Sequence, residues 1–504
     1  MLPAVNRKLL LGLDVLGAWP VVLLAGVLHT ASFSPGHAWP LQLLAVALLA
    51  HASWDQRPAR AFRHGLVFGL GWLASGLWWL YISLHDFGHL PSVLAGAAVL
   101  LLAFVLSLYY GAALALAAWL RDDRHPAVHA LVWAGCWLAA ELARAQWLTG
   151  FPWIASGYAH AVGPLAGWAP WVGVYGIVAL AGLLSAGVAA ALRSSGRVLM
   201  AALLLVGLGL VLPQQFTESS GKLRVSLLQP NVPQDQKFNA GLMADNLDKL
   251  VGQIEAARGQ LVLTPESVVP LPMDWLEKDF PDQAARLRKA AAERPVLLGI
   301  FLGNPQDGYV NSLLGLGTEQ AYSYGKRHLL PFGESIPPGF RWFVKALGIP
   351  MDDQARGDHQ RPLPVAGQRI RPLICYEDLF GEDFVASVQD DAEAATLLLN
   401  VSNLAWFGPR MVQDQHLQFS QMRALEFQRP FIRSTNTGAT AVLDHQGKVL
   451  ARLPVETRDR LEIEVEGRRG ATPYARWLAA VGLWPLWALA LAPILWAWRG
   501  RRKR

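Results

Sequence analysis

Residues 371–378 read RPLICYED, an apolar run that ends at a cysteine, a tyrosine and two acidic residues. Similar short apolar runs alternate with helical stretches between residues 223 and 466, which predicts a layered α/β domain with buried strands. We expect its strands at residues 223–228, 261–264, 296–302, 311–316, 372–375, 396–401, 439–443 and 461–465. We expect its helices near residues 240–258, 282–293, 379–389 and 413–428.

The rest of the chain has a different composition. Of the 504 residues, 53% are hydrophobic and only 16% are charged, whereas soluble domains are usually about 25% charged. A membrane-spanning helix needs about 20 mostly apolar residues. Eight candidate spans occur, at residues 11–33, 38–53, 65–84, 91–119, 127–143, 167–192, 197–213 and 476–498. The first span is followed by further spans and not by a small-residue cleavage site. We therefore interpret it as a membrane helix and not as a signal peptide.

These spans predict the fold class and the domain organisation. The fold is expected to be a multi-span α-helical membrane bundle joined to one soluble α/β domain. Transmembrane helices one to seven lie in residues 1–213, and residues 214–222 form a polar linker. The soluble domain occupies residues 223–466, and the last transmembrane helix with a basic tail occupies residues 467–504.

Basic residues predict the orientation of the bundle. Arginine and lysine gather in every second connection and in the tail after the last span, and such residues mark the cytoplasmic side. An even number of spans places both termini in the cytoplasm, so the soluble domain, which follows span seven, lies outside. The formal net charge of +6 is explained by these membrane-end residues, and no nucleic-acid partner is expected.

Three polar residues follow apolar runs of the soluble domain. Glu266 follows LVLTP, Lys326 follows AYSYG, and Cys375 ends RPLI. Sites in α/β folds are usually built at strand ends. A thiol is nucleophilic as a thiolate, so it needs a base such as a carboxylate, and a lysine can stabilise an oxyanion. The only other cysteine, Cys136, lies inside span five, so no disulfide is expected.

The sequence around these residues resembles the nitrilase superfamily. The similarity lies in PES at 265–267, GKRHLLPFGE at 325–334 and CYED at 375–378. Together with the preceding membrane helices, the chain is similar to the apolipoprotein N-acyltransferase family. Further matching stretches are residues 32–35, 149–152, 157–158, 229–234, 400–408 and 433–438. The resemblance implies a nitrilase-like αββα sandwich in a bacterial inner membrane, with the catalytic domain on the outer face.

The resemblance also implies a reaction. Cys375 would accept an acyl chain from a phospholipid as a thioester. The α-amine of an N-terminal diacylglyceryl-cysteine on an apolipoprotein would then take that chain. Glu266 would be the general base and Lys326 would help to hold the oxyanion. Glu334 would be a second active-site carboxylate, and Tyr376 and Glu377 would shape the pocket wall.

A lipid gate is expected beside this site. Residues 337–350 read PPGFRWFVKALGIP, in which Phe340, Trp342 and Phe343 alternate with basic residues, a mixture that suits a membrane interface. An ordinary amphipathic core helix is the alternative for this segment. Phe238 is a further expected gate residue, and it stands where relatives commonly have tryptophan. Leu404 stands where a polar or small residue is expected, so details of the substrate pocket can differ.

Other classes of function fit less well. No metal-ligand spacing, dinucleotide fingerprint or P-loop occurs, so no metal or cofactor is expected. The histidines His328, His359, His416 and His445 are scattered, which favours surface or capping positions. One alternative is a membrane-anchored amide or nitrile hydrolase with the same triad, although such an enzyme needs at most one anchor. A transporter or binding protein with an inactive domain is a further alternative, which the intact triad disfavours.

Overall fold

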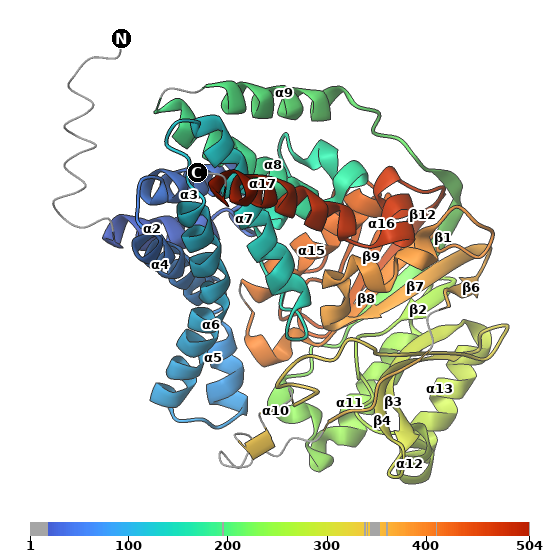
Figure 1. Ribbon diagram of the computed structural model, residues 1–504. Coiled ribbons are helices and arrows are strands. Elements are labelled where there is room, and N and C mark those ends of the chain that lie inside the picture. Colours follow the sequence, from blue (N-terminus) through green and yellow to red (C-terminus); the bar gives the residue numbers. More distant parts are fainter. Residues whose placement is uncertain are drawn as a thin grey trace. The chain divides into compact units, whose positions relative to one another are not determined.

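The computed structural model describes residues 19–193, 196–336, 339, 341–342, 353–358, 361–409 and 411–502 (Figure 1). The chain forms two compact units. The helical unit contains the described parts of Met1–Tyr81, Leu90–Leu212 and Leu483–Arg504. The α/β unit contains the described parts of Ile82–His89 and Pro213–Gly482.

The helical unit consists of apolar helices. Its main helices are α2 (Trp19–Thr30), α3 (Trp39–Ser53), α4 (Pro58–Gly76), α6 (Ser92–Trp119), α7 (Pro126–Gln146), α8 (Ala169–Ala191), α9 (Arg197–Val211) and α17 (Trp484–Arg502). Among the described residues, three helices are long and apolar enough to cross a membrane, or up to five if each of two bent helix pairs is one span. Three shorter apolar helices accompany them. Each of the eight candidate spans overlaps one of these helices or pairs.

A buried ion pair organises the end of α7. Arg144 Nη2 lies 2.9 Å from Glu141 Oε2, and neither side chain has exposed surface. Arg144 Nη1 also donates to the carbonyl oxygens of Phe151 and Trp153, and the backbone N–H of Ser156 donates to Glu141 Oε1. The pair therefore satisfies backbone groups of the irregular segment after α7, where helical hydrogen bonding has stopped.

Glu141→Ala is expected to destabilise this unit strongly. Removing one partner of a buried ion pair leaves the other charge uncompensated, at a cost of about 3–5 kcal/mol. Asp55→Ala is the matched control, because the Arg193–Asp55 pair is partly exposed and such pairs contribute about 0–1 kcal/mol. Thermal unfolding of both variants in detergent measures the difference, and equal midpoints would contradict the prediction.

The α/β unit contains two six-stranded sheets (Figure 1). The first has the order β12-β1-β2-β3-β4-β5 and comprises β1 (Glu218–Gln229), β2 (Leu261–Leu263), β3 (Val296–Asn304), β4 (Gly308–Leu316), β5 (Tyr322–Gly325) and β12 (Asp459–Arg469). The second has the order β11-β10-β9-β8-β7-β6 and comprises β6 (Leu363–Val365), β7 (Gln368–Ile374), β8 (Leu397–Ser402), β9 (Phe431–Thr435), β10 (Ala441–Leu443) and β11 (Val449–Arg452).

Helices cover the outer faces of both sheets. One core cluster joins side chains of the two sheets, and a second joins the first sheet to α11 (Ala240–Glu255) and α13 (Pro281–Glu293). On the other side, α15 (Val412–Phe427) covers the second sheet, because Arg433 of β9 bonds to His416 of α15. These layers form the αββα sandwich that the resemblance to the nitrilase superfamily implies. The expected helix over 379–389 is wrong: short 3₁₀ turns occupy Cys375–Leu379, Gly381–Asp383 and Val385–Val388.

One segment that the sequence assigns to the membrane part belongs to the α/β unit. Ile82–His89 contains the π-helical turn Ser83–Phe87, and the ring of Phe87 meets the ring of Trp406 edge to face at 5.5 Å. Trp406 lies in the 3₁₀ turn Leu404–Phe407, which follows β8 after Asn403. The connection between two membrane helices thus contributes an aromatic contact to the α/β unit.

Candidate active site

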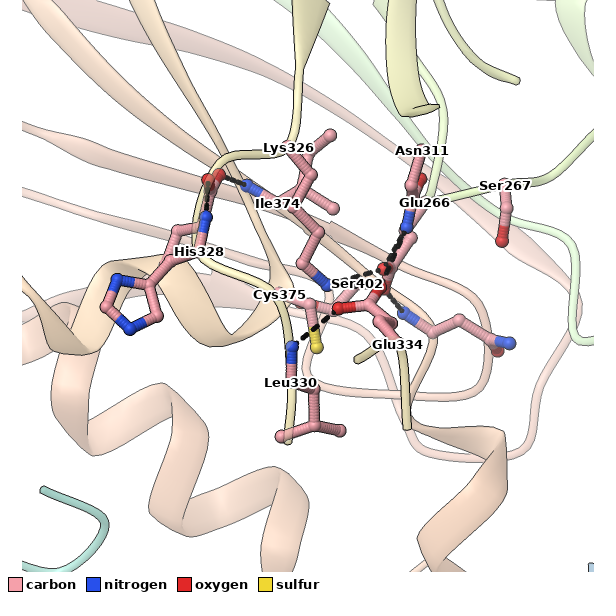
Figure 2. A network of polar contacts seen from close by, with 12 residues as sticks. Glu266, Ser267, Asn311, Lys326, His328, Leu330, Glu334, Ile374, Cys375 and Ser402 are labelled. Atoms are coloured by element: carbon pink, nitrogen blue, oxygen red, sulfur yellow. Dashed lines mark hydrogen bonds and ion pairs between the residues drawn. The ribbon is translucent and has the colours of Figure 1, made fainter. Parts of the chain in front are cut away.

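Lys326 lies between the carboxylates of Glu266 and Glu334 (Figure 2). It directly follows β5, and its Nζ lies 3.2 Å from Glu266 Oε1 and 2.7 Å from Glu334 Oε1. Asn311 of β4 donates through Nδ2 to the same two oxygens, at 2.7 and 3.2 Å. All four side chains are buried, so one ammonium and one amide together hold two carboxylates out of water.

The second oxygen of each carboxylate accepts a backbone hydrogen bond. The N–H of Asn403 donates to Glu266 Oε2, and the N–H of Leu330 donates to Glu334 Oε2, both at 2.8 Å. Burial by itself would raise the pKa of Glu266, but Lys326 and the Asn403 N–H outweigh it and lower this pKa. Burial would also lower the pKa of Lys326, yet Glu266 and Glu334 raise it overall. Glu266 and Lys326 therefore stabilise each other's charged forms, and the Glu266 carboxylate is able to accept a proton.

Cys375 directly follows β7 and is half-buried. Its φ of 52° is left-handed, which is uncommon for a residue with a side chain and is often found at functional sites. Figure 2 shows its sulfur beside the Lys326 amine and the Glu334 carboxylate. Burial raises the pKa of the Cys375 thiol well above its ordinary value. The charge of Glu266 raises this pKa further, against the opposing effect of Lys326. The resting nucleophile is thus a thiol that needs a base at the moment of attack.

Glu377 connects the Lys326 loop to the nucleophile strand. Its Oε1 accepts from the backbone N–H groups of Arg327 and His328, and its Oε2 accepts from Ile374 N–H and Tyr324 OH. Glu377 is buried, and its two oxygens act as a clamp that holds the backbone after Lys326 against the backbone before Cys375. Tyr376 is also buried, and its ring contacts the rings of Phe380 and His328.

Glu377→Gln is expected to slow turnover about 10- to 100-fold with little change in KM, because small misplacements of catalytic groups have effects of this size. An amide nitrogen at either oxygen position would face donors instead of accepting from them. Glu393→Gln is the control, because that carboxylate pairs with Arg369 on the surface. Steady-state kinetics of the two variants give the comparison, and equal kcat values would argue against the clamp.

The predicted gate residues are only partly described. Phe238 ends the short helix α10 (Gln234–Lys237) and is 56% exposed, and Trp342 is 69% exposed. Phe340 and Phe343 lie outside the described residues. Two of the four predicted residues therefore present large aromatic surfaces at the exterior of the α/β unit.

Several residues of the site were not predicted. Asn311 was missed because it lies within an apolar strand, and Lys237 because it resembles a surface lysine. Lys237 is instead buried, its Nζ donates to Ser267 Oγ at 2.8 Å, and burial lowers its pKa to about 8. The expectation of a surface or capping position was wrong for His416, which is fully buried and contacts the Cys375 carbonyl. The sequence offered one sign of this position: His416 lies in the expected helix at residues 413–428, which follows the NVSNLAWFG stretch.

Comparison with known proteins covers both units. A model described as the apolipoprotein N-acyltransferase N-terminal domain matches residues 25–187, and the carbon-nitrogen hydrolase model matches residues 224–474. An apolipoprotein N-acyltransferase from Ralstonia nicotianae is 45% identical over 91% of this chain and 90% of its own length. One from Verminephrobacter eiseniae is 44% identical, over 97% of this chain and 98% of its own length. With an α/β unit of the carbon-nitrogen hydrolase type joined to apolar helices, this chain belongs to the apolipoprotein N-acyltransferase family.

Proposed function

We propose that this membrane protein transfers an acyl chain from a phospholipid, through a thioester on Cys375, to the N-terminal diacylglyceryl-cysteine of an apolipoprotein. The buried cluster of Glu266, Lys326 and Glu334 beside Cys375 carries the proposal. It combines a nucleophile, an ionised base and a fixed cation, which are the three groups that acyl transfer requires.

The first half-reaction forms the thioester. Glu266 takes the proton of the Cys375 thiol as the sulfur attacks the ester carbonyl carbon of the phospholipid. Lys326 stabilises the negative charge that develops on the carbonyl oxygen. The tetrahedral intermediate then collapses, the ester C–O bond breaks, and Glu266 returns the proton to the departing lysophospholipid oxygen.

The second half-reaction uses the same groups. The acceptor α-amine attacks the thioester carbonyl carbon, and Glu266 takes a proton from the nitrogen. The C–S bond breaks, an amide is released, and the proton passes to the sulfur, which restores the starting thiol. Glu334 keeps the Lys326 ammonium in place throughout, because its Oε1 is the nearer of the two carboxylate partners.

An isolated acyl-enzyme tests the proposal. Protein incubated with a diacyl phospholipid is expected to gain the mass of one acyl chain on Cys375, and hydroxylamine should remove it. Adding a synthetic diacylglyceryl-cysteine peptide should discharge the adduct and yield N-acylated peptide. Discharge to free fatty acid at the same rate with or without the peptide would support the hydrolase alternative instead.

The proposed location is the inner membrane of a bacterium, with the α/β unit on its outer face. The Ser219→Cys variant, made in a Cys136→Ala, Cys375→Ala background, is expected to react with an impermeant maleimide in intact spheroplasts. A cysteine at Arg499 should react only after the membrane is permeabilised. The alternating basic connections between the spans motivate this prediction, and the opposite labelling pattern would invert the proposed topology.

A further inference from the structure

A fully buried polar cluster lies behind the nucleophile. The carbonyl oxygen of Cys375 accepts from Asn400 Nδ2 at 2.8 Å and lies 3.1 Å from His416 Nε2. The same His416 nitrogen lies 3.1 Å from Asp378 Oδ1. None of these three side chains has exposed surface. The triad chemistry described above uses none of them.

The hydrogen bonds of His416 define its protonation state. Arg433 Nη2 lies 2.8 Å from His416 Nδ1, and a guanidinium can only donate, so Nδ1 is the unprotonated acceptor. Nε2 faces two oxygens and therefore carries the hydrogen. The imidazole is neutral, consistent with the lowered pKa of His416, which results from burial together with Arg433 and against the effect of Asp378. His416 thus presents its Nε2 hydrogen to both the Cys375 carbonyl and the Asp378 carboxylate.

Both donors reach this carbonyl from the outer face of the second sheet. In β8, Leu397, Leu399 and Val401 belong to the core between the sheets, so Asn400, which alternates with them, points to the opposite face. His416 is on α15, which covers that same face. The Cys375 carbonyl is consequently directed away from the space between the sheets.

The other end of the same peptide has the opposite direction. In a trans peptide the C=O and N–H groups lie in one plane and point in opposite directions. The N–H of Tyr376 is therefore turned toward the first sheet, whose β2 and β5 lead into Glu266 and Lys326. A backbone N–H beside the nucleophile, facing the base and the lysine, is placed to donate to a developing oxyanion.

We propose that His416 and Asn400 are positioning residues of acyl transfer: by holding the Cys375 carbonyl, they aim the Tyr376 N–H at the carbonyl oxygen of the acyl group. This inference rests on the proposed function, because it assumes an oxyanion at Cys375. The two hydrogen bonds also fix the peptide of a nucleophile whose own φ is left-handed. Asp378, Ser420 and Arg433 in turn hold His416 in its donor state.

Two reactions of the same sulfur separate this role from a merely structural one. Acylation by a short-chain p-nitrophenyl ester passes through an oxyanion and releases p-nitrophenol. Alkylation by iodoacetamide forms an S–C bond as the C–I bond breaks, with no oxyanion. Both are measured on the full-length protein in detergent, in a Cys136→Ala background, so that Cys375 is the only thiol.

His416→Leu and Asn400→Leu are each expected to slow acylation about 10-fold, and the double variant about 10²-fold, toward the loss seen when one oxyanion donor is removed. Alkylation should stay close to the wild-type rate in each. His416→Gln retains a donor near the Nε2 position and is expected to recover most of the acylation. Asp414→Asn is the matched control, since Asp414 lies on the same helix but pairs with Arg452 and does not touch the Cys375 carbonyl.

The outcomes separate the two proposals. Acylation and alkylation that fall together, or acylation that does not change, would overturn the positioning role. If the leucine variants fail to fold, Asn400→Asp takes their place, because it keeps the side-chain shape while replacing the donor with an acceptor. The ratio of its acylation rate to its alkylation rate then tests the positioning role. A wild-type protein that forms no acyl-Cys375 would overturn the proposed function, and the positioning role with it.

Discussion

Cys375→Ala is expected to abolish the acyl-enzyme and to lower N-acylation by about 10⁴-fold or more, because loss of the nucleophile removes the covalent route altogether. Cys375→Ser should be nearly as inactive. A hydroxyl is much less acidic than a thiol, and this site already raises the pKa of the thiol. A base that can deprotonate the thiol during attack is therefore too weak for serine.

The chain supplies its own control for this prediction. Cys136 is the only other cysteine, and it is buried in α7 of the helical unit. Cys136→Ala is expected to leave the acyl adduct and the N-acylation rate unchanged. Intact-mass analysis and transfer to an acceptor peptide measure both quantities in each variant. Near-normal N-acylation by Cys375→Ala would show that another group is the nucleophile.

Strands that consist of buried aliphatic residues are easily predicted from the sequence. β8 runs through Leu397, Leu398 and Leu399, so its apolar sequence alone marks it. β9 was missed because its buried residues include Arg433, Ser434 and Thr435, which resemble a polar loop. Their polarity is satisfied by distant partners, such as the pairing of Arg433 with Asp378, and no local pattern reveals these.

The same reason explains the false helix after the nucleophile. Residues 379–389 are compatible with an amphipathic helix when considered alone. In the structure, the preceding Glu377 and Asp378 are bonded to β7 and to α15, and the chain continues as separate 3₁₀ turns. Tertiary hydrogen bonds thus replace the regular helical pattern.

The candidate site was predictable where residues follow apolar strands. Glu266, Lys326 and Cys375 stand at such positions, and together with Glu334 they form one cluster or lie beside it. Asn311 does not stand out in this way, because a single amide inside a strand carries no sign of the carboxylates that it will bridge. Residues that the proposed chemistry uses could be found from local context, whereas residues that hold the site together depend on the fold.

Glu266→Gln and Lys326→Met should both slow acyl transfer, yet they should shift the pKa of the Cys375 thiol in opposite directions. Loss of the base is expected to slow thioester formation about 10²- to 10⁴-fold. Loss of the lysine removes an oxyanion partner, which slows both half-reactions by about 2–4 kcal/mol of barrier. Lys326→Met also leaves two buried carboxylates without their cation, so its unfolding temperature should fall as well.

The pH dependence of alkylation shows the difference. The Glu266 charge raises the pKa of Cys375 and the Lys326 charge lowers it. Glu266→Gln should therefore move the alkylation midpoint to lower pH, because the thiolate is no longer repelled, while Lys326→Met should move it to higher pH. A Glu266→Gln variant whose sulfur ionises more readily but is acylated more slowly has lost the transfer of the proton from the thiol to the departing oxygen. Equal shifts of the same sign, or fast acyl-enzyme formation in Glu266→Gln, would contradict the assignment of Glu266 as the base.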